Sequence, residues 1–306
     1  MLQRFIGVLH IVYRSYGGEN QKGRPSYYSK LLALESTIRA FEELQKGAAE
    51  LIFLNDGPIP EDRLRVMEAS GEIIARANLG MRGSIKAGMA LPAQRRWKPG
   101  DLVWFAEDDY LYLPQAFADL LKATELFPQA AYFGLYAQIG DRLPSGNPTD
   151  ETRVPASWQD SEVTLVNGHP WRRALSTTST FGARVKPVLE DRRMMDMAME
   201  SGGAFDHTTC LMYQGHMPYP MFALTEPLRS TKDAKDWLRR AAISAVRAGL
   251  NGYQAMRRVT GSSIRLLVAP EPALSTHLET AYLASGNDWE AVARSTKKWA
   301  QARGLA

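Results

Sequence analysis

The chain has 306 residues, 45% of them hydrophobic and 23% charged, with a formal net charge of +4. This length allows one large α/β domain with a tail or two small domains, and the composition is that of an ordinary globular protein. The mild positive charge suits an anionic ligand, but it is too small to indicate a nucleic-acid-binding protein.

The cysteine count and the hydropathy limit which kinds of site and which cellular compartment the sequence is compatible with. Cys210 is the single cysteine, which excludes an intrachain disulfide and a four-cysteine zinc site. No apolar run approaches the roughly 20 residues that cross a bilayer. The start of the chain, MLQRFIGVLHIVYRS, is interrupted by His10 and lacks a small-residue cleavage site, so it indicates a first strand and not a signal peptide. We therefore expect a cytoplasmic protein in a reducing compartment.

Strand-like and helix-like segments alternate through the first 140 residues. Short β-rich apolar runs predict strands over 5–13, 49–57, 72–78, 101–109 and 130–140. Apolar residues at helical spacing predict helices over 27–45, 83–94 and 114–127. This alternation favours an α/β fold with a mostly parallel sheet flanked by helices, in which ligands bind beyond the carboxyl ends of the strands.

The rest of the chain is less regular. Residues 141–170 are rich in Pro, Gly, Asp and Ser and predict a long irregular excursion over the cleft. A strand or loop followed by a helix is expected over 176–201. One or two basic amphipathic helices over 232–260 and a terminal helix over 287–304 complete the pattern. We therefore expect a main domain over 1–231 and a helical C-terminal extension over 232–306.

Three adjacent acids end the strand in VWFAEDDYLYLPQAF: Glu107, Asp108 and Asp109. Such close like charges repel one another unless a positive charge neutralises them. A hard divalent cation such as Mg²⁺ or Mn²⁺ is one solution, and a solvated acidic turn is the alternative. Asp56 ends the strand in FLNDG and is expected to face the same cleft, although an ordinary Asp-Gly turn explains it equally well.

This order of strand, acidic triplet, aromatic-apolar pair, proline and helix resembles the D-x-D region of GT-A glycosyltransferases. The Glu-Asp-Asp form is similar to the N-acetylglucosaminyltransferase I type and, more loosely, to glycosyltransferase family 2. The resemblance covers about residues 5–140, and 175–231 loosely. It implies a GT-A-like (Rossmann-like) fold with a nucleotide-binding half over 1–140 and an acceptor half over 141–231. It also implies metal-dependent transfer of a hexosyl or N-acetylhexosaminyl group from a nucleotide-diphosphate sugar to a hydroxyl, with inversion.

The resemblance assigns roles to the residues of the cleft. Asp109 would be the direct ligand of Mn²⁺ or Mg²⁺, while Glu107 and Asp108 would contact the ribose or hold water on the metal. Asp56 would accept a hydrogen bond from the nucleobase. The remaining donor-site residues would be Tyr13 and Arg14 beside the base, and Arg82 at the diphosphate with Lys86 one turn further on. For Arg82 and Lys86, charges on an exposed helix surface are the alternative.

A carboxylate must take the proton of the acceptor hydroxyl in an inverting transfer. Asp206 in AFDHTTCLMYQG is the first candidate, because the resemblance places an aromatic-Asp-polar sequence after a helix and before a strand ending near TEPLRST (225–231). Asp191 in VLEDRR is the rival, which could equally be an acid in the first turn of a helix.

Other residues carry weaker hypotheses. Some GT-A enzymes add a C-terminal histidine to the metal, a place that His277 would fill if it is not a loop or capping histidine. Trp171 and the run STTSTFG (176–182) are expected to line an acceptor site, since aromatic faces suit sugar rings. The basic helices over 232–260 would contact an anionic membrane or form a homodimer surface.

Three competing functions remain. Sugar-phosphate nucleotidyltransferases share the architecture, and YGGENQKGRPSYYSK (16–30) contains their Gly, Arg, Pro and Lys ingredients, although the spacing departs from that signature. A non-catalytic nucleotide-sugar-binding protein or degenerate transferase is the second. A Rossmann dehydrogenase is disfavoured because no Gly-x-Gly-x-x-Gly follows the first strand.

Overall fold

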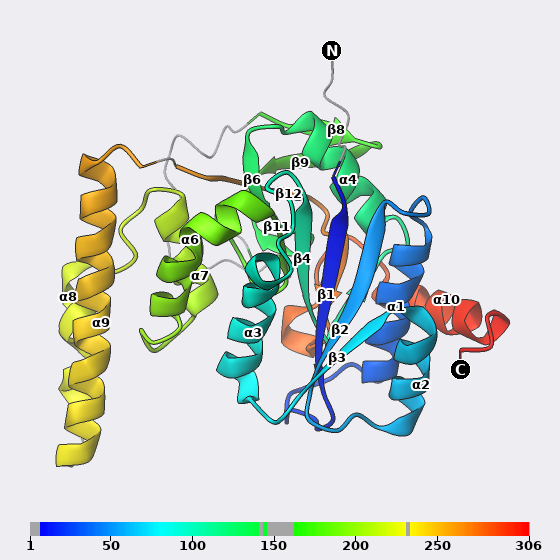
Figure 1. Cartoon of the computed structure of the whole chain (residues 1–306), viewed down its shortest axis with the longest axis horizontal. Coiled ribbons are helices and arrows are strands. Elements are labelled where there is room, and N and C mark those ends of the chain that lie inside the picture. Colours follow the sequence, from blue (N-terminus) through cyan, green and yellow to red (C-terminus); the bar gives the residue numbers. More distant parts are fainter. Residues whose placement is uncertain (1–6, 141–142, 146–161, 231–232, 263, 306) are drawn as a thin grey trace.

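The computed structural model describes residues 7–140, 143–145, 162–230, 233–262 and 264–305. A nine-stranded mixed sheet forms its centre (Figure 1). Its strands in spatial order are β3 (Glu72–Arg76), β2 (Ala49–Asp56), β1 (Leu9–Tyr16), β4 (Leu102–Glu107), β11 (Phe181–Arg184), β6 (Ala130–Phe133), β12 (Leu266–Pro270), β9 (His169–Arg173) and β8 (Thr164–Val166). β3, β2, β1 and β4 are mutually parallel, whereas β11 and β9 run against their neighbours. The predicted α/β class with a mostly parallel sheet is confirmed.

Two short strand pairs lie outside this sheet. β10 (Ser176–Thr177) pairs with β7 (Ala137–Gln138), and β13 (Ser275–His277) pairs antiparallel with β5 (Tyr110–Tyr112). The second pair joins the C-terminal part of the chain to the residues directly after the acidic triplet.

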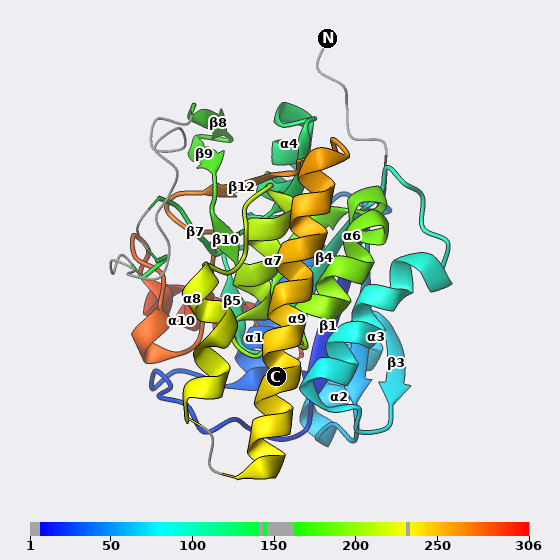
Figure 2. The ribbon, with the colours of Figure 1, turned by 90° about the vertical axis from the view of Figure 1, so that its left-hand side faces the viewer.

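Helices cover both faces of the sheet (Figures 1 and 2). One face packs against α1 (Lys30–Glu42), α2 (Glu61–Ser70), α4 (Ala116–Leu126) and α10 (Trp289–Ala302). The other packs against α3 (Gly80–Gln94), α6 (Val185–Ala198) and α7 (Phe205–Tyr213), and α9 (Ala234–Val259) packs on the outer side of α6. The short helix α8 (Met221–Thr225) and the 3₁₀ helix η1 (Glu226–Ser230) lie against α9, and the 3₁₀ helix η2 (Thr280–Tyr282) follows β13.

Side-chain alternation along β1 decides which residue meets which layer. Leu9, Ile11 and Tyr13 enter the core beneath α1, while Val12 enters the core beneath α3 and α6. Successive strand residues point to opposite faces of a sheet, so Arg14 lies on the α3 side. Helix ends follow their local sequences as well: Ser29 caps α1 by accepting a hydrogen bond from the backbone N–H of Leu32 at 3.0 Å.

Several sequence predictions need correction. Helix α2 was not expected, because its sequence is mostly polar and shows little helical periodicity. It buries only three residues, which are Arg63, Val66 and Met67. The expected irregular excursion over 141–170 contains β8 and the start of β9, while 141–142 and 146–161 lie outside the described residues. TEPLRST was expected near a strand end, but its described part, 225–230, is helical.

The two helices expected in the extension over 232–306 are present as α9 and α10, but the segment between them is part of the main domain. α9 stands on the outside as one long helix, but β12 is inserted between β6 and β9 in the main sheet. β13 pairs with β5, and α10 packs against α1. None of the helices in the described part of the chain has the length and hydropathy needed to span a bilayer.

Candidate active site

The acidic triplet lies at the carboxyl end of β4, next to the end of β1. Glu107 is paired in register with Arg14, and the Arg14 Nη2 donates to Glu107 Oε1 at 2.5 Å. The Arg14 Nη1 also donates to Ser84 Oγ on α3, at 3.1 Å. Burial raises the pKa of Glu107, although the charge of Arg14 opposes this shift. Arg14 therefore joins the acidic strand end to the start of α3.

Asp108 points to the opposite face of the sheet. Its Oδ2 accepts hydrogen bonds from Lys30 Nζ at 2.8 Å, Ser15 Oγ at 2.9 Å and the Tyr16 N–H at 3.1 Å. Lys30 is the first residue of α1 and is itself buried. Asp108 thus holds the end of β1 against α1, which commits one of its oxygens to contacts within the protein.

Asp109 lies among three basic groups from two distant parts of the chain. Its Oδ2 is 3.1 Å from both Arg24 Nη2 and His277 Nε2, and 3.6 Å from Lys22 Nζ. Burial opposes ionisation, but the His277 hydrogen bond and the charges of His277, Lys22 and Arg24 outweigh it. Together they hold the pKa of the Asp109 carboxyl well below its usual range. Asp109 is therefore an anion in the folded protein.

Protein cations thus relieve the repulsion that three adjacent acids create. Each acid has its own basic partners, which are Arg14, Lys22, Arg24, Lys30 and Arg63. A solvated acidic turn does not describe this cluster, because Asp108 and Asp109 are only 7% and 6% exposed. Lys22 and Arg63 were missed from the sequence, since one lies in a polar loop and the other in the unpredicted helix α2.

A cavity of about 470 Å³ opens above this cluster, and we call it the donor-side cavity. It is lined by residues of β1, the loop that follows it, the end of β2, the start of α3, the triplet and His277. Asp56 is among them, and its Oδ1 accepts a hydrogen bond from the Leu79 N–H at 2.6 Å. Gly57 follows with φ 86°, and a Cβ there would lie 2.1 Å from Asn78 Oδ1. The Asp-Gly turn and the cavity-facing position of Asp56 therefore coexist.

Three residues expected in this cavity, Tyr13, Arg82 and Lys86, lie elsewhere. Tyr13 is 1% exposed and packs edge-on against Phe53 in the core beneath α1, because strand alternation turns it away from Arg14. Arg82 lies on the exposed side of α3, where it and Lys86 form ion pairs with Glu200 at 3.1 and 2.9 Å. Their place at the cavity is taken by neighbouring α3 residues, Gly80, Met81 and Ser84.

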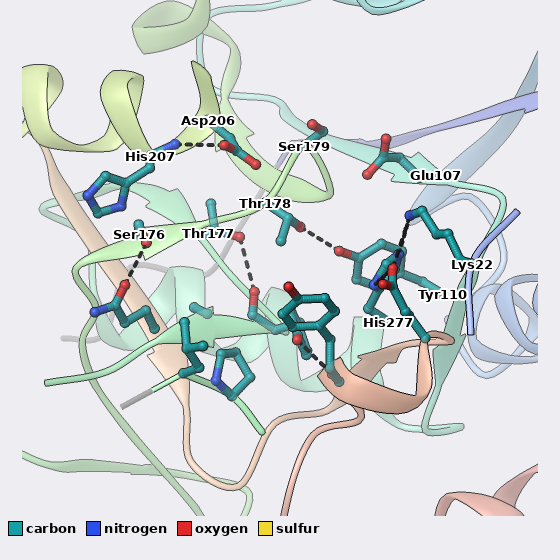
Figure 3. A pocket seen from close by; sticks show the side chains of 17 residues that line it. Lys22, Glu107, Tyr110, Ser176, Thr177, Thr178, Ser179, Asp206, His207 and His277 are labelled. Atoms are coloured by element: carbon teal, nitrogen blue, oxygen red, sulfur yellow. Dashed lines mark hydrogen bonds and ion pairs between the residues drawn. The ribbon is translucent and has the colours of Figure 1, made fainter. Parts of the chain in front are cut away.

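A second cavity, of about 410 Å³, adjoins the first, and we call it the acceptor-side cavity. The two share Lys22, Glu107 and His277. Figure 3 shows β10 and the two residues after it, 176–179, running along this cavity, with Asp206 and Glu107 on either side of Ser179. The ring of Tyr110 lies nearby, and its hydroxyl donates to Thr178 Oγ1 at 2.7 Å. This segment therefore lies between the strand end of the triplet and α7, which carries Asp206, and contacts both sides.

Asp206 lies in the first turn of α7. Its Oδ1 accepts a hydrogen bond from the backbone N–H of His207 at 2.9 Å. Burial raises the pKa of the Asp206 carboxyl, despite this hydrogen bond. Within the described ranges, no Lys or Arg forms an ion pair with Asp206. It is a carboxylate in a cavity with a raised affinity for a proton, which is the property of a general base.

The rival residue Asp191 has different surroundings. It is 4% exposed and accepts hydrogen bonds from the Tyr132 hydroxyl at 2.9 Å, Arg265 Nε at 3.2 Å and Arg257 Nη2 at 3.4 Å. It lines neither cavity. Trp171 is also remote from them, because its side chain is fully buried in the core between β9 and its neighbours.

The donor-side cavity offers two protein ligands for a divalent cation. Among the described residues, no group of three or more His, Cys, Asp and Glu side chains could hold a metal ion by itself. Asp109 and His277 nevertheless form an adjacent carboxylate–imidazole pair at the donor-side cavity. Mg²⁺ is commonly bound through one or two protein groups, with phosphate oxygens and water completing its shell. The pair therefore fits a cation that a diphosphate brings with it, although Lys22 and Arg24 share the same carboxylate oxygen.

Arg24 and Lys30, the two basic residues of the nucleotidyltransferase signature, form ion pairs with the acidic triplet. Arg24 pairs with Asp109, and Lys30 pairs with Asp108 beneath the cavity. Arg24 also donates to the Leu278 carbonyl at 2.7 Å, so it ties the loop after β1 to the segment after β13. Neither of these contacts favours a triphosphate-binding loop.

Comparisons with known proteins give fold-level likenesses of low similarity. No protein-family model matches the chain, and no curated protein sequence matches it. Glucosyl-3-phosphoglycerate synthase from Mycobacterium tuberculosis, solved with Mn²⁺, uridine diphosphate and glucosyl-3-phosphoglycerate, is 16% identical over 42% of this chain and 43% of that chain, with a TM-score of 0.31. S. aureus TarS, residues 1–349, is 14% identical over 83% of this chain and 74% of that chain, with a TM-score of 0.41. This chain thus spans less than half the length of the synthase, and neither structure assigns a substrate to it.

Proposed function

We propose that the chain is a glycosyltransferase that moves a sugar from a nucleotide-diphosphate sugar to an acceptor hydroxyl, with inversion at the anomeric carbon. One observation carries the proposal. Two adjoining cavities meet at Glu107, Lys22 and His277, one lined by cation-paired carboxylates and the other by the partly buried Asp206. A donor and an acceptor placed in them would meet at that junction.

The donor-side cavity offers groups suited to a nucleoside diphosphate. Asp56 lines its β2 end and can accept from a donor N–H of a nucleobase. Lys22 and Arg14 place positive charge beside the junction, where a leaving diphosphate develops negative charge. Asp109 and His277 would hold Mn²⁺ or Mg²⁺, which when bound would neutralise charge on the diphosphate.

The acceptor-side cavity offers the proton acceptor. In the proposed step, the acceptor oxygen attacks the anomeric carbon as the bond from that carbon to the diphosphate oxygen breaks. The hydroxyl proton passes to the Asp206 carboxylate, and the electron pair of the broken bond leaves with the nucleoside diphosphate. The raised pKa of Asp206 strengthens it as a base, because burial penalises the charged form that it gives up on protonation.

The first test is ligand-dependent thermal stability of the full chain. Nucleoside diphosphates are compared one by one, each with Mn²⁺ and with chelator, because binding to the folded state raises the melting temperature by mass action. We expect one diphosphate to raise it, and more so with Mn²⁺. The nucleotide sugars of that base are then incubated with candidate saccharide acceptors, and release of the diphosphate is measured.

The outcomes separate the competing functions. A stabilising response to a nucleoside triphosphate together with a sugar phosphate would replace the proposal by a nucleotidyltransferase. Stabilisation by a nucleotide sugar without turnover on any acceptor would favour a binding protein. No response to any nucleotide would remove the proposal, and the cluster would then be an ion-pair network that serves folding.

A further inference from the structure

The positive charge of the chain is concentrated in one segment. Residues 221–259, which include α8, η1 and α9, contain eight Lys and Arg residues and three Asp and Glu residues. Their net charge of +5 exceeds the +4 of the whole chain, so the remainder carries a slight negative charge. We call this segment the basic arm.

The outer side of α9 is apolar. Figure 2 looks onto this helix, with α8 beside it. Trp237 and Leu238 near its start are 50% and 64% exposed, and Met256 and Val259 near its end are 55% and 88% exposed. At 3.6 residues per turn these positions share one side of the helix, and the residues between them on that side are Ala and Gly. No charged side chain interrupts this side.

Charged residues flank the apolar side. Lys235 lies along one edge of it and Arg258 along the other, at the end of the helix, while Arg239 lies further round, toward the groove described below. Their side chains are exposed. A helix that combines an uninterrupted apolar side with flanking basic residues is the pattern of a helix that lies in a membrane interface.

α8 adds exposed apolar residues next to α9, and a basic groove lies on the other side of α9 from its apolar side. Met221 and Phe222 on α8 are 79% and 66% exposed. The first half of α9 and η1 line a groove of about 500 Å³ that contains four arginines: Arg229, Arg239, Arg240 and Arg247. Arg240 and Arg247 pair with Asp236 and Glu226, whereas in the described part of the chain Arg229 and Arg239 have no ion-pair partner. Two positive charges therefore remain for anionic groups.

We propose that the basic arm docks the protein onto an anionic lipid bilayer. The charge argument selects the bilayer over a second copy of the chain, because pairing two arms would bring two strongly positive surfaces together. An anionic bilayer complements both features at once, since its headgroups meet the basic edges and its acyl boundary meets the apolar side. α9 has 26 residues and is therefore about 39 Å long, enough to lie along the membrane plane as an extended contact.

The test is sedimentation of the full chain with lipid vesicles. We expect binding to vesicles of phosphatidylcholine with phosphatidylglycerol at low salt, little binding to phosphatidylcholine alone, and loss of binding at high salt. The double variant Lys235→Glu with Arg239→Glu should bind at least about tenfold more weakly, since each basic side chain near an anionic surface contributes roughly fivefold in partitioning. The double variant Trp237→Ala with Leu238→Ala should also weaken binding to the vesicles. This loss should be smaller at lower salt, because the electrostatic attraction is then stronger.

Matched variants outside the arm control for general effects. Leu165 on β8 is 65% exposed, close to the 64% of Leu238, so Leu165→Ala removes a similar exposed apolar side chain. Arg65→Glu on α2 reverses an exposed charge, since the Arg65 side chain is 70% exposed. Both should bind vesicles as the parent chain does. Absence of binding to anionic vesicles, or equal loss in arm and control variants, would overturn the proposal. So would a dimer in light scattering that Leu238→Ala dissociates.

Discussion

Asp109 of the donor-side cavity and Asp206 of the acceptor-side cavity have opposite electrostatic surroundings. On the donor side, Glu107, Asp108 and Asp109 each have a basic partner, and His277 adds a hydrogen bond to Asp109. On the acceptor side, Asp206 accepts only a backbone hydrogen bond among the described residues. The pKa of Asp109 is accordingly held low, and that of Asp206 is raised by burial.

This contrast shows how two carboxylates in one cleft can have different roles. A carboxylate fixed by cations keeps its charge and its position, so it can orient a ligand or a metal ion without taking a proton. A carboxylate that is buried without a cation gains from protonation, so it can accept a proton during a reaction. The ion pairs around each acid, more than the acids themselves, indicate the division of roles.

The largest effect is expected from removing the proposed base. Asp206→Asn keeps the size and the backbone hydrogen bond acceptor but cannot take the proton, so kcat should fall by about 10²- to 10⁴-fold. Nucleotide binding, measured by thermal shift, should be unchanged because Asp206 lies outside the donor-side cavity. Asp191→Asn is the matched control, and it should lower the melting temperature through lost contacts with Arg257 and Arg265. If Asp191→Asn folded but lost kcat, and Asp206→Asn kept its kcat, Asp191 would be the base in place of Asp206.

The donor side of the comparison is tested at Asp109. Asp109→Asn should weaken Mn²⁺-dependent nucleotide binding by roughly tenfold or more, because it removes the charge shared by His277, Lys22 and Arg24. Titration calorimetry with the nucleoside diphosphate, with Mn²⁺ and with chelator, measures the change. His277→Ala should reduce the Mn²⁺ dependence in the same direction. Unchanged Mn²⁺ dependence in both variants would show that the pair does not hold the metal.

The acceptor side is tested by the pH dependence of turnover. Asp206 must be ionised to accept the proton, so kcat should fall as the pH decreases through its pKa. Because burial raises that pKa, the decline should begin at a higher pH than for an ordinary Asp carboxyl. The measurement is kcat against pH at saturating substrates. A profile that is flat down to the ordinary Asp range would contradict the raised pKa.

Glu35 extends the comparison to a carboxylate outside both cavities. It is 3% exposed on α1, and burial raises its pKa to about 7, with the charge of Lys297 opposing the shift. The folded state therefore binds this proton more tightly than the unfolded state, so its stabilising contribution is present at low pH and is lost as the pH rises toward 7. Glu35→Gln should raise the free energy of unfolding by about 1–3 kcal/mol at about pH 8, and by little near about pH 5. Thermal melts at both pH values test this, and equal shifts would contradict it.

Local patterns predicted much of the fold. Apolar runs and helical spacing identified β1, β2, β3, β4, α1, α3 and α4, because the apolar residues of each element are close together or recur at helical spacing. α2 escaped because its buried positions are few, and the Asp-Gly turn at Asp56 was recognised from its residue types alone. The place of β12 in the sheet had no local signal, since a strand's neighbours are set by the packing of the whole chain.

The candidate site was only partly predictable for the same reason. The triplet and Asp56 were found because carboxylates at strand ends are a local pattern. Tyr13 was expected at the cavity, but strand alternation turns its side chain to the opposite face of the sheet. Arg82 was expected at the diphosphate, but its side chain pairs with Glu200, which follows a helix distant in sequence. Lys22 is brought to Asp109 by an irregular loop, and His277 lies 168 residues away in sequence. Such contacts depend on tertiary structure that residue types do not encode locally.

The pairing of β13 with β5 has a consequence for the timing of synthesis. Leu111 pairs with Thr276 and Tyr110 with His277, so the donor-side cavity acquires its last wall from residues made long after the acidic triplet. Chains emerge from the ribosome N-terminus first, at roughly 5–20 residues per second. A nascent chain that has not yet released residue 277 can fold β1 to β4 and α1, but it lacks the histidine beside Asp109 and the strand that covers β5. Any ligand contact that needs His277 can therefore form only after residue 277 has left the ribosome.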